Sequence, residues 1–233
     1  MQTSFFDANN TAPKKSYRAI RHDIVRERQS SNCESAHHPE EKKQQVKRVL
    51  SEYSGWGDLS ILELFAGHGN LTKLYCDYGE VLAYEKKGAV FDKLVSNTQD
   101  CMLLRCEKVD SYREYHGLIY LKQSFDVIDI DPYGFPNRFF PDIFLLINHG
   151  ILFVTMPKPY VNILNGITQT HLITYYGDHN PSQETIINRI ALWGLSHWRQ
   201  VSLIDSIDLD SVWRFAFEVK KVKATDYTGV KNR

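Results

Sequence analysis

Short apolar segments alternate with segments of helical character between Gly57 and Met156, and this alternation constrains the fold more than any other feature of the chain. The apolar segments are typical of buried strands and cover residues 61–65, 80–85, 101–106, 125–130 and 150–156. Each intervening segment is long enough for a crossover helix or a helix plus loop, which parallel neighbouring strands require. The sequence therefore predicts an α/β fold with a mainly parallel sheet and helices on both faces.

The C-terminal part of the chain follows a different pattern. A long helix is predicted from Asn180 to Trp198, and strand-like segments follow at residues 201–206 and 211–220. The connection between these two segments, I-D-L-D, is short, so the two strands must be antiparallel. The complete prediction is a seven-stranded, mostly parallel sheet that ends in an antiparallel hairpin.

We expect one sizeable domain, at residues 57–222, because a chain of 233 residues can bury one full hydrophobic core. Residues 1–56 are predicted to form a basic N-terminal extension that contains a mobile tail and helices. One of these helices begins at Pro39 and carries an apolar face. Residues 223–233 are predicted to form a basic C-terminal tail.

The formal net charge is zero, but the charges are unevenly distributed. Residues 1–50 hold ten Lys and Arg against six Asp and Glu, and residues 214–233 hold six against two. Basic ends can bind a polyanion such as nucleic acid, or they can simply keep terminal segments solvated. Charge alone leaves both interpretations open.

The cysteine spacing favours free thiols in a reducing compartment, since no C-x-x-C pair is present. The cysteines are Cys33, Cys76, Cys101 and Cys106. No segment approaches the roughly 20 apolar residues of a membrane span, and the polar start lacks the core of a signal peptide. We therefore expect a cytoplasmic protein without a membrane partner. Cys33, His37 and His38 lack a second ligand pair, so no metal site is predicted.

The first predicted strand runs into the sequence Phe65-Ala66-Gly67-His68-Gly69. Two glycines spaced by one residue let the backbone turn sharply and approach a ligand beside a helix amino terminus. The third glycine of a dinucleotide-binding fingerprint is replaced by threonine. His68 can either contact the ligand or only fill the turn.

Two glutamates follow the next predicted strands. Glu85 ends the second strand, where a carboxylate can accept hydrogen bonds from both hydroxyls of a ribose. The alternative is a solvated glutamate beside the two lysines that follow it. Glu107 follows the third strand and is placed for an adenine amino group, although Asp100 and Asp110 compete for that role.

Residues 125–136 read F-D-V-I-D-I-D-P-Y-G-F-P, so a strand-like segment ends in carboxylates and an aromatic turn. Asp, Pro and Gly are all turn residues, and a plain turn is the simplest alternative. The position favours a binding site, because open α/β sheets bind ligands at the carboxyl ends of their strands.

These segments resemble class I S-adenosylmethionine-dependent methyltransferases. E-L-F-A-G-H-G, Tyr84-Glu85, the D-I-D-P-Y-G-F-P motif with G-I-L-F-V-T after it, and the hairpin strand W-R-F-A-F-E-V are most similar to tRNA guanosine N2-dimethyltransferases. The likeness covers about residues 61–220 and implies a Rossmann-like fold with S-adenosyl-L-methionine as cofactor. The cofactor-binding residues that it implies are Phe65, Ala66, Gly67, Gly69, Glu85, Glu107 and Asp129.

The resemblance narrows the reaction to methylation of an amino group. An exocyclic amine on a base is a poor nucleophile, because its lone pair is delocalised into the ring. The Asp131 carboxylate and the Pro132 carbonyl would accept the amine hydrogens and aim the nitrogen at the methyl group. Tyr133 would stack on the base, and Asp131 can also take the proton. Asp129 is assigned to support of the cofactor or the turn.

The substrate rim is assigned to Gly134, Lys158 and Tyr160. Lys158 and Tyr160 lie in M-P-K-P-Y, where the family usually continues V-T-x-T-D. The family's C-terminal domain is missing from this sequence, so a partner subunit that replaces it is one expectation.

The sequence therefore predicts an N-methyltransferase that acts on an exocyclic amino group of a nucleic-acid base, with guanine N2 in tRNA-like RNA as first choice. An adenine amino group in DNA or RNA is the alternative. A non-catalytic RNA-binding module with the same fold and a small-molecule methyltransferase are the other hypotheses. The nucleotide and the number of methyl groups transferred are left open.

Overall fold

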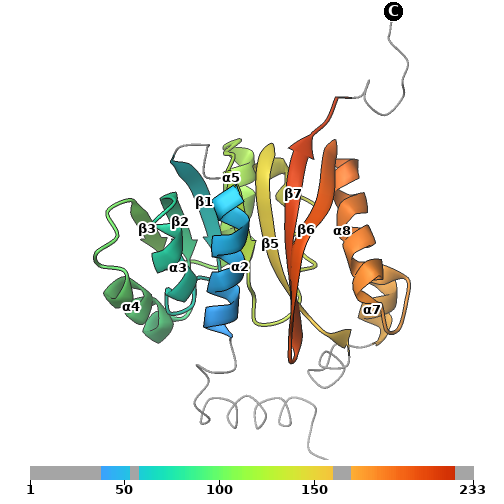
Figure 1. The fold of residues 1–233 in the computed structure, drawn as a ribbon, viewed down its shortest axis with the longest axis horizontal. Coiled ribbons are helices and arrows are strands. Elements are labelled where there is room, and N and C mark those ends of the chain that lie inside the picture. Colours follow the sequence, from blue (N-terminus) through green and yellow to red (C-terminus); the bar gives the residue numbers. More distant parts are fainter. Residues whose placement is uncertain (1–37, 53–57, 160–168, 224–233) are drawn as a thin grey trace, which may run out of the picture. The chain divides into compact units, whose positions relative to one another are not determined.

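A seven-stranded sheet forms the centre of the protein, with the strand order β3-β2-β1-β4-β5-β7-β6 (Figure 1). The computed structural model describes residues 38–52, 58–159 and 169–223. Strands β1 to β5 pair in parallel, whereas β7 lies antiparallel between β5 and β6. The predicted sheet and its antiparallel hairpin are therefore confirmed.

The strands are β1 Leu59–Leu64, β2 Gly79–Tyr84, β3 Leu104–Glu107, β4 Val127–Ile130, β5 His149–Pro157, β6 Arg199–Leu209 and β7 Val212–Lys221. The helices are α2 Pro39–Glu52, α3 Asn70–Tyr75, α4 Gly88–Asn97, α5 Ser111–Tyr120, the short 3-10 helix η2 Ile143–Leu146, α7 Gln169–Tyr176 and α8 Gln183–Ser196. Within the described ranges, no helix is long and apolar enough to cross a membrane.

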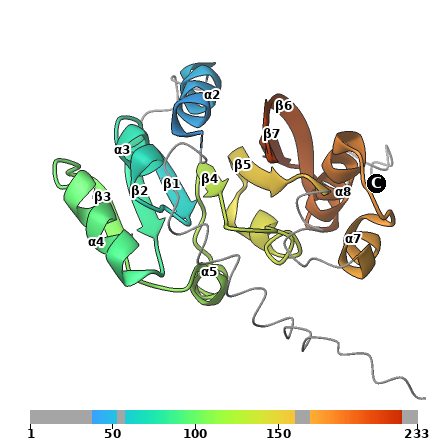
Figure 2. The ribbon, with the colours of Figure 1, turned by 90° about the horizontal axis from the view of Figure 1, so that it is seen from below.

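Alternate residues along the central strands supply two hydrophobic cores, one on each face of the sheet. Ile61 belongs to the core that α2, α3 and α4 cover, and the next residue, Leu62, belongs to the core that α5, α7 and α8 cover. Figure 2 shows α2 and α3 on one side of the sheet and α5 on the other. Both faces are therefore covered, as a parallel sheet requires.

Helix α2 forms as the sequence predicts. It begins at Pro39, has Glu40 and Glu41 in its first turn, and buries Val46 and Val49. Acidic residues at this end complement the helix dipole. The helix packs against α3 and β6 and lies in one compact unit with the sheet, from His38 onward. Most of the predicted extension and tail lies outside the described residues.

The segment between β4 and β5 differs from the prediction. A crossover helix or a helix plus loop was expected here, but the segment contains only the 3-10 helix η2. Its apolar residues include Phe139, Phe140, Phe144 and Leu145. The three phenylalanines are buried and Leu145 is exposed. Three prolines in this segment limit a longer helix, because each lacks a backbone donor.

A buried ion pair joins β4 to β7 across β5. Nη1 and Nη2 of Arg214 donate to the two carboxylate oxygens of Asp129 at 3.0 and 2.7 Å, and both side chains are completely buried. Tyr75 Oη donates to Asp129 at 2.6 Å, and Arg214 also donates to Thr155 Oγ1 at 2.9 Å. Burial would lower the pKa of Arg214, but the charge and hydrogen bonds of Asp129, together with Tyr75 and Asp131, outweigh it and raise the pKa.

Breaking this pair should destabilise the whole domain. We expect Arg214→Met to lower the free energy of unfolding by about 3–5 kcal/mol, because it leaves the Asp129 carboxylate buried without its cation. Urea unfolding of Arg48→Met is the control, since Arg48 forms a largely exposed pair with Asp205 that contributes about 0–1 kcal/mol. Equal losses in the two variants would contradict the assignment.

Candidate active site

The carboxyl ends of β1, β2 and β4 meet at one edge of the sheet. Leu64 of β1 pairs with Tyr84 of β2 and with Ile130 of β4. The next residues along the three strands are therefore neighbours, and these are Phe65, Glu85 and Asp131. The three predicted motifs come together for this reason.

The glycine loop after β1 has an unusual backbone. Phe65, Gly67 and Gly69 have φ values of 85°, 58° and 85°, and the N–H groups of Phe65 and Ala66 both donate to the Tyr84 carbonyl at 3.1 and 2.9 Å. A positive φ at a non-glycine residue costs about 1–3 kcal/mol and is common at ligand sites. The ring of Phe65 packs edge-on against two aromatic rings, which holds this conformation.

The two glycines of this loop have different surroundings. A Cβ at Gly67 would meet no atom within 4 Å, so the loop is open to a ligand at that point. A Cβ at Gly69 would lie 2.9 Å from Cδ1 of Leu94 and 3.0 Å from Cγ2 of Thr98. Gly69 therefore lets the start of α3 pack closely on α4, whereas Gly67 leaves room at the edge.

Glu85 holds the loop from the end of β2. Its carboxylate accepts hydrogen bonds from the Gly67 N–H at 3.1 Å and from the Lys87 N–H at 2.7 Å. The residue is only 9% exposed, which does not fit the alternative of a solvated glutamate. A carboxylate oxygen can accept more than one hydrogen bond, so this position can still bind two hydroxyls.

Glu107, at the end of β3, and the two acids that compete with it are all paired or exposed. The Glu107 carbonyl accepts from the Glu85 N–H at 3.1 Å, while its side chain pairs with Arg105 at 2.5 Å. Asp110 caps α5 through the Tyr112 N–H and bonds Lys86, which lowers the pKa of Asp110. Asp100 is exposed. Glu107 thus lies next to Glu85, and the predicted contact with an adenine stays a prediction.

The turn after β4 presents a carboxylate and an aromatic ring. The side chain of Asp131 is 24% exposed and accepts a hydrogen bond from Lys42 Nζ at 2.5 Å. Tyr133 is 72% exposed, and Lys87 Nζ lies 5.0 Å from the centroid of its ring. Tyr133 therefore lies beside the loop that carries Glu85. Neither Asp131 nor Tyr133 is sealed inside the protein.

Pro132 and Gly134 shape this turn. Gly134 has a φ of 124°, and its N–H donates to the Pro132 carbonyl at 2.9 Å. The carbonyl oxygen has a second lone pair, so the turn fixes its direction while it keeps the capacity to accept one more hydrogen bond.

The environment of Asp131 favours the carboxylate form. Burial alone would raise its pKa, but Lys42 and Arg214, together with hydrogen bonds from Lys42 and Thr155, lower the pKa below its usual value. The group is therefore an ionised acceptor at neutral pH.

Two predicted site residues form contacts within the protein that the sequence did not indicate. Asp129 is completely buried and its carboxylate is bound by Arg214 and Tyr75, so its side chain supports the sheet, and its predicted cofactor contact stays a prediction. Lys158 pairs with Asp208 of the hairpin, and its Nζ lies 5.9 Å from the Trp213 ring centroid. Its substrate role stays a prediction, and Tyr160 lies outside the described residues.

Lys42 is the site residue that sequence reasoning missed. Its contact with Asp131 spans 89 positions in the chain, which no local pattern shows. One signal was present, because Lys42 precedes Val46 and Val49 by four and seven residues and so falls on the apolar face of its helix. A charged residue on such a face needs a buried partner.

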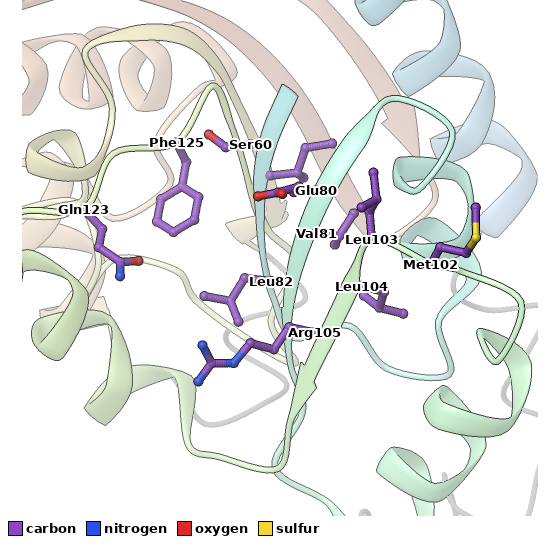
Figure 3. A pocket seen from close by; sticks show the side chains of 11 residues that line it. Ser60, Glu80, Val81, Leu82, Met102, Leu103, Leu104, Arg105, Gln123 and Phe125 are labelled. Atoms are coloured by element: carbon purple, nitrogen blue, oxygen red, sulfur yellow. The ribbon is translucent and has the colours of Figure 1, made fainter. Parts of the chain in front are cut away.

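A separate hollow of about 400 Å³ lies at the opposite end of the strands (Figure 3). Ser60, Glu80 and Leu104, which line it, stand near the starts of β1, β2 and β3. The hollow therefore does not belong to the site at the carboxyl edge.

The described cysteines do not form a disulfide or a metal centre. Cys76, Cys101 and Cys106 are free and half-buried, and burial raises the pKa of the Cys76 and Cys106 thiols. In the part of the chain that the structure describes, no group of three or more His, Cys, Asp or Glu could hold a metal ion. Cys33 and His37 lie outside that part.

No family model matches the sequence, and no curated protein matches it closely. Its fold is similar to that of Trm1 from Pyrococcus horikoshii in complex with S-adenosyl-L-methionine, with a TM-score of 0.61 and 14% identity over 77% of this chain and 54% of that one. The chain thus spans about half the length of that protein.

Two further solved structures share the fold. The N-methyltransferase NodS from Bradyrhizobium japonicum has a TM-score of 0.53 and 10% identity over 78% of this chain and 96% of that one. The putative methyltransferase yhhF from Escherichia coli has a TM-score of 0.50 and 14% identity over 77% and 86%. The chain therefore has the class I S-adenosylmethionine-dependent methyltransferase fold.

The two loop glycines should respond differently to alanine. Gly67→Ala is expected to cost about 1–2 kcal/mol of stability, because only the positive φ opposes the new side chain. Gly69→Ala should cost a further 1–3 kcal/mol or so, because its Cβ also overpacks the α3–α4 contact. Urea unfolding measures both, and a Gly67 variant that is the less stable of the two would contradict this account.

Proposed function

We propose that this chain is an S-adenosyl-L-methionine-dependent methyltransferase that acts on an exocyclic amino group of a nucleic-acid base, with guanine N2 in RNA as the first choice. One observation carries the proposal. The turn of Asp131, Pro132 and Tyr133 stands at the carboxyl edge of a methyltransferase-type sheet, beside the open glycine loop and Glu85.

The residues at the edge fit the cofactor. The backbone at Gly67 leaves space where a side chain would otherwise lie, and the buried carboxylate of Glu85 is held where it can accept hydrogen bonds from ribose hydroxyls. Ala66 and Phe65 shape the loop, and Glu107 adjoins Glu85. When bound, S-adenosyl-L-methionine supplies an electrophilic methyl group on a sulfonium.

The turn after β4 fits a planar amine. The Asp131 carboxylate and the Pro132 carbonyl are two acceptors in sequence, and together they can bind the two hydrogens of an amino group and orient its lone pair. The exposed ring of Tyr133 can stack on the base that carries this group. Stacking and two fixed acceptors hold the nitrogen in one direction, which a weak nucleophile requires.

The proposed substrate is nucleic acid because of the ring and the charge beside it. Base stacking on an aromatic side chain is typical of single-stranded or splayed-out nucleotides. Lys87 lies over the same ring, and an ammonium group there can contact a phosphate of the same strand. An adenine amino group presents the same two hydrogens, so the identity of the methylated base is decided by experiment.

The decisive measurement is product analysis. The protein is incubated with labelled S-adenosyl-L-methionine and total tRNA, rRNA or DNA, and the nucleosides are identified by mass spectrometry. We expect label on N2 of guanosine. Label on adenine would move the proposal to the alternative base, and binding of RNA with no label on any nucleoside would support a non-catalytic module.

Asp131→Asn should lower kcat by about 100-fold or more, since it removes an electrostatic contact to the reacting amine. Cofactor affinity, measured by calorimetry, should stay close to that of the wild type. Asp77→Asn is the control, because Asp77 is an exposed carboxylate in the turn after α3. Undiminished methyl transfer by the Asp131 variant would refute its role.

Glu85→Gln should weaken cofactor binding by about 1.5–3 kcal/mol, because a charged acceptor for the ribose hydroxyls becomes neutral. Calorimetric titration with S-adenosyl-L-methionine measures the loss. The matched control is Glu80→Gln, since Glu80 is an exposed glutamate at the opposite end of the same strand. Equal affinities for the two variants would exclude Glu85 from the cofactor site.

A further inference from the structure

Lys42 connects helix α2 to the proposed site. It lies on the buried face of α2 and is 5% exposed, and its Nζ donates to Oδ2 of Asp131 at 2.5 Å. The neighbouring Lys43 turns outward and pairs with Glu40, so the two lysines have different roles on one helix. The contact brings a residue from outside the βα units to the end of β4.

The buried ammonium of Lys42 would destabilise the protein without Asp131 as its partner. A lysine ammonium loses most of its hydration when it is buried, and it is tolerated there only when a charged or polar group binds it. Asp131 provides that group. Because the Asp131 side chain keeps 24% of its surface exposed, the pair connects the buried face of α2 to the surface of the site.

The charges around Asp131 identify Lys42 as its counter-ion. Arg214 on β7 also faces Asp131, but its guanidinium is engaged by both oxygens of Asp129. Thr155 on β5 donates a hydrogen bond to Asp131 and carries no charge. Among these neighbours, Lys42 is therefore the cation that is not already matched to another carboxylate.

The remaining acid near Asp131, Glu63, does not change this pairing of carboxylates with cations. Glu63 on β1 is buried, and burial first, then the nearby Asp129, raises its pKa well above the usual value, which favours its neutral form. Its Oε2 accepts a hydrogen bond from Thr72 Oγ1 at 2.5 Å. Two carboxylates and two cations thus remain, as the pairs Asp129–Arg214 and Asp131–Lys42.

We propose that Lys42 is a positioning residue for the amine methylation proposed above: it holds one oxygen of Asp131 and keeps the group as a hydrogen-bond acceptor, so that Asp131 orients the amine and does not carry its proton away. This inference rests on the proposed function. In the step itself, the nitrogen lone pair forms the new N–C bond, the C–S bond breaks with its electron pair on sulfur, and the nitrogen loses its proton to water.

A pH profile tests this role. Lys42→Met removes the cation, so the pKa of Asp131 rises and its carboxylate is lost at a higher pH as acid is added. We expect the acid limb of kcat/KM to move to higher pH in this variant, with a lower plateau. Lys43→Met on the same helix should leave the profile of the wild type, and Lys42→Arg should restore most of it. An unchanged acid limb in Lys42→Met would overturn the inference.

A second measurement is independent of turnover. The carboxyl carbon of Asp131 is followed by NMR through a pH titration, with Asp131→Asn used to assign the signal. Its midpoint should be higher in Lys42→Met, or in Lys42→Gln if the methionine variant does not fold, than in the wild type. Equal midpoints would exclude Lys42 as the counter-ion.

The two measurements separate the two hypotheses. If the wild-type protein transfers no methyl group to any nucleic acid, the proposed function fails, and the carboxyl titration still decides whether Lys42 controls Asp131. If methyl transfer occurs but neither the profile nor the midpoint responds to Lys42, the function stands and this inference fails.

Discussion

The buried ion pair of Asp129 and Arg214 determines how the two parts of the sheet fit together. Arg214 is on the antiparallel hairpin and Asp129 is on the parallel strand β4, so the pair crosses β5 between them. Desolvation of each charge costs several kcal/mol, and the cost is offset only when the geometry is retained. The bidentate contact and the hydrogen bond from Tyr75 meet that condition and fix the end of β4.

Asp131, like Asp129, needs a cation close to its carboxylate. Asp131 follows directly after β4, two positions beyond Asp129, and Arg214 faces both carboxylates, so the two side chains lie on the same side of the sheet. Two carboxylates at such a short separation would repel each other if neither had a cation beside it. Arg214 neutralises the inner carboxylate and Lys42 the outer one, and the outer one remains partly exposed. The geometry of the proposed site therefore depends on residues from the first and last described elements of the chain.

The sequence predicted the fold well where hydrophobic periodicity was clear. The hairpin followed from a connection too short for a crossover, and β1, β2, β4 and β5 lie close to the predicted segments. The third strand was placed too early, since residues 101–106 were expected and Leu104–Glu107 was found. Met102 is 95% exposed at the edge of the sheet, so apolar character alone did not indicate burial there.

The sequence could predict the site residues that follow the carboxyl ends of strands, but not the residues that bind them from elsewhere in the chain. Parallel strands bring their carboxyl ends to one edge, which places Gly67, Glu85 and Asp131 together. The partners of the two aspartates could not be found in this way, because Arg214 and Lys42 lie 85 and 89 positions away and depend on the hairpin and on α2. Asp129 was assigned to the cofactor for this reason, although its carboxylate is buried.

Lys87 contacts both Glu85, which is proposed to bind the cofactor, and Tyr133, which is proposed to stack on the base. Its N–H binds the carboxylate of Glu85, and its ammonium lies over the ring of Tyr133. A base that stacks on this face of Tyr133 must displace the ammonium, while the backbone contact to Glu85 is unaffected by a side-chain rotation. Cation–π contacts at exposed rings contribute only about 0.5–1 kcal/mol, and base stacking contributes about 1–3 kcal/mol, so the exchange favours the base. In the proposed complex with nucleic acid, the displaced ammonium would lie beside a polyanionic strand, where attraction to phosphate would offset the loss of the ring contact.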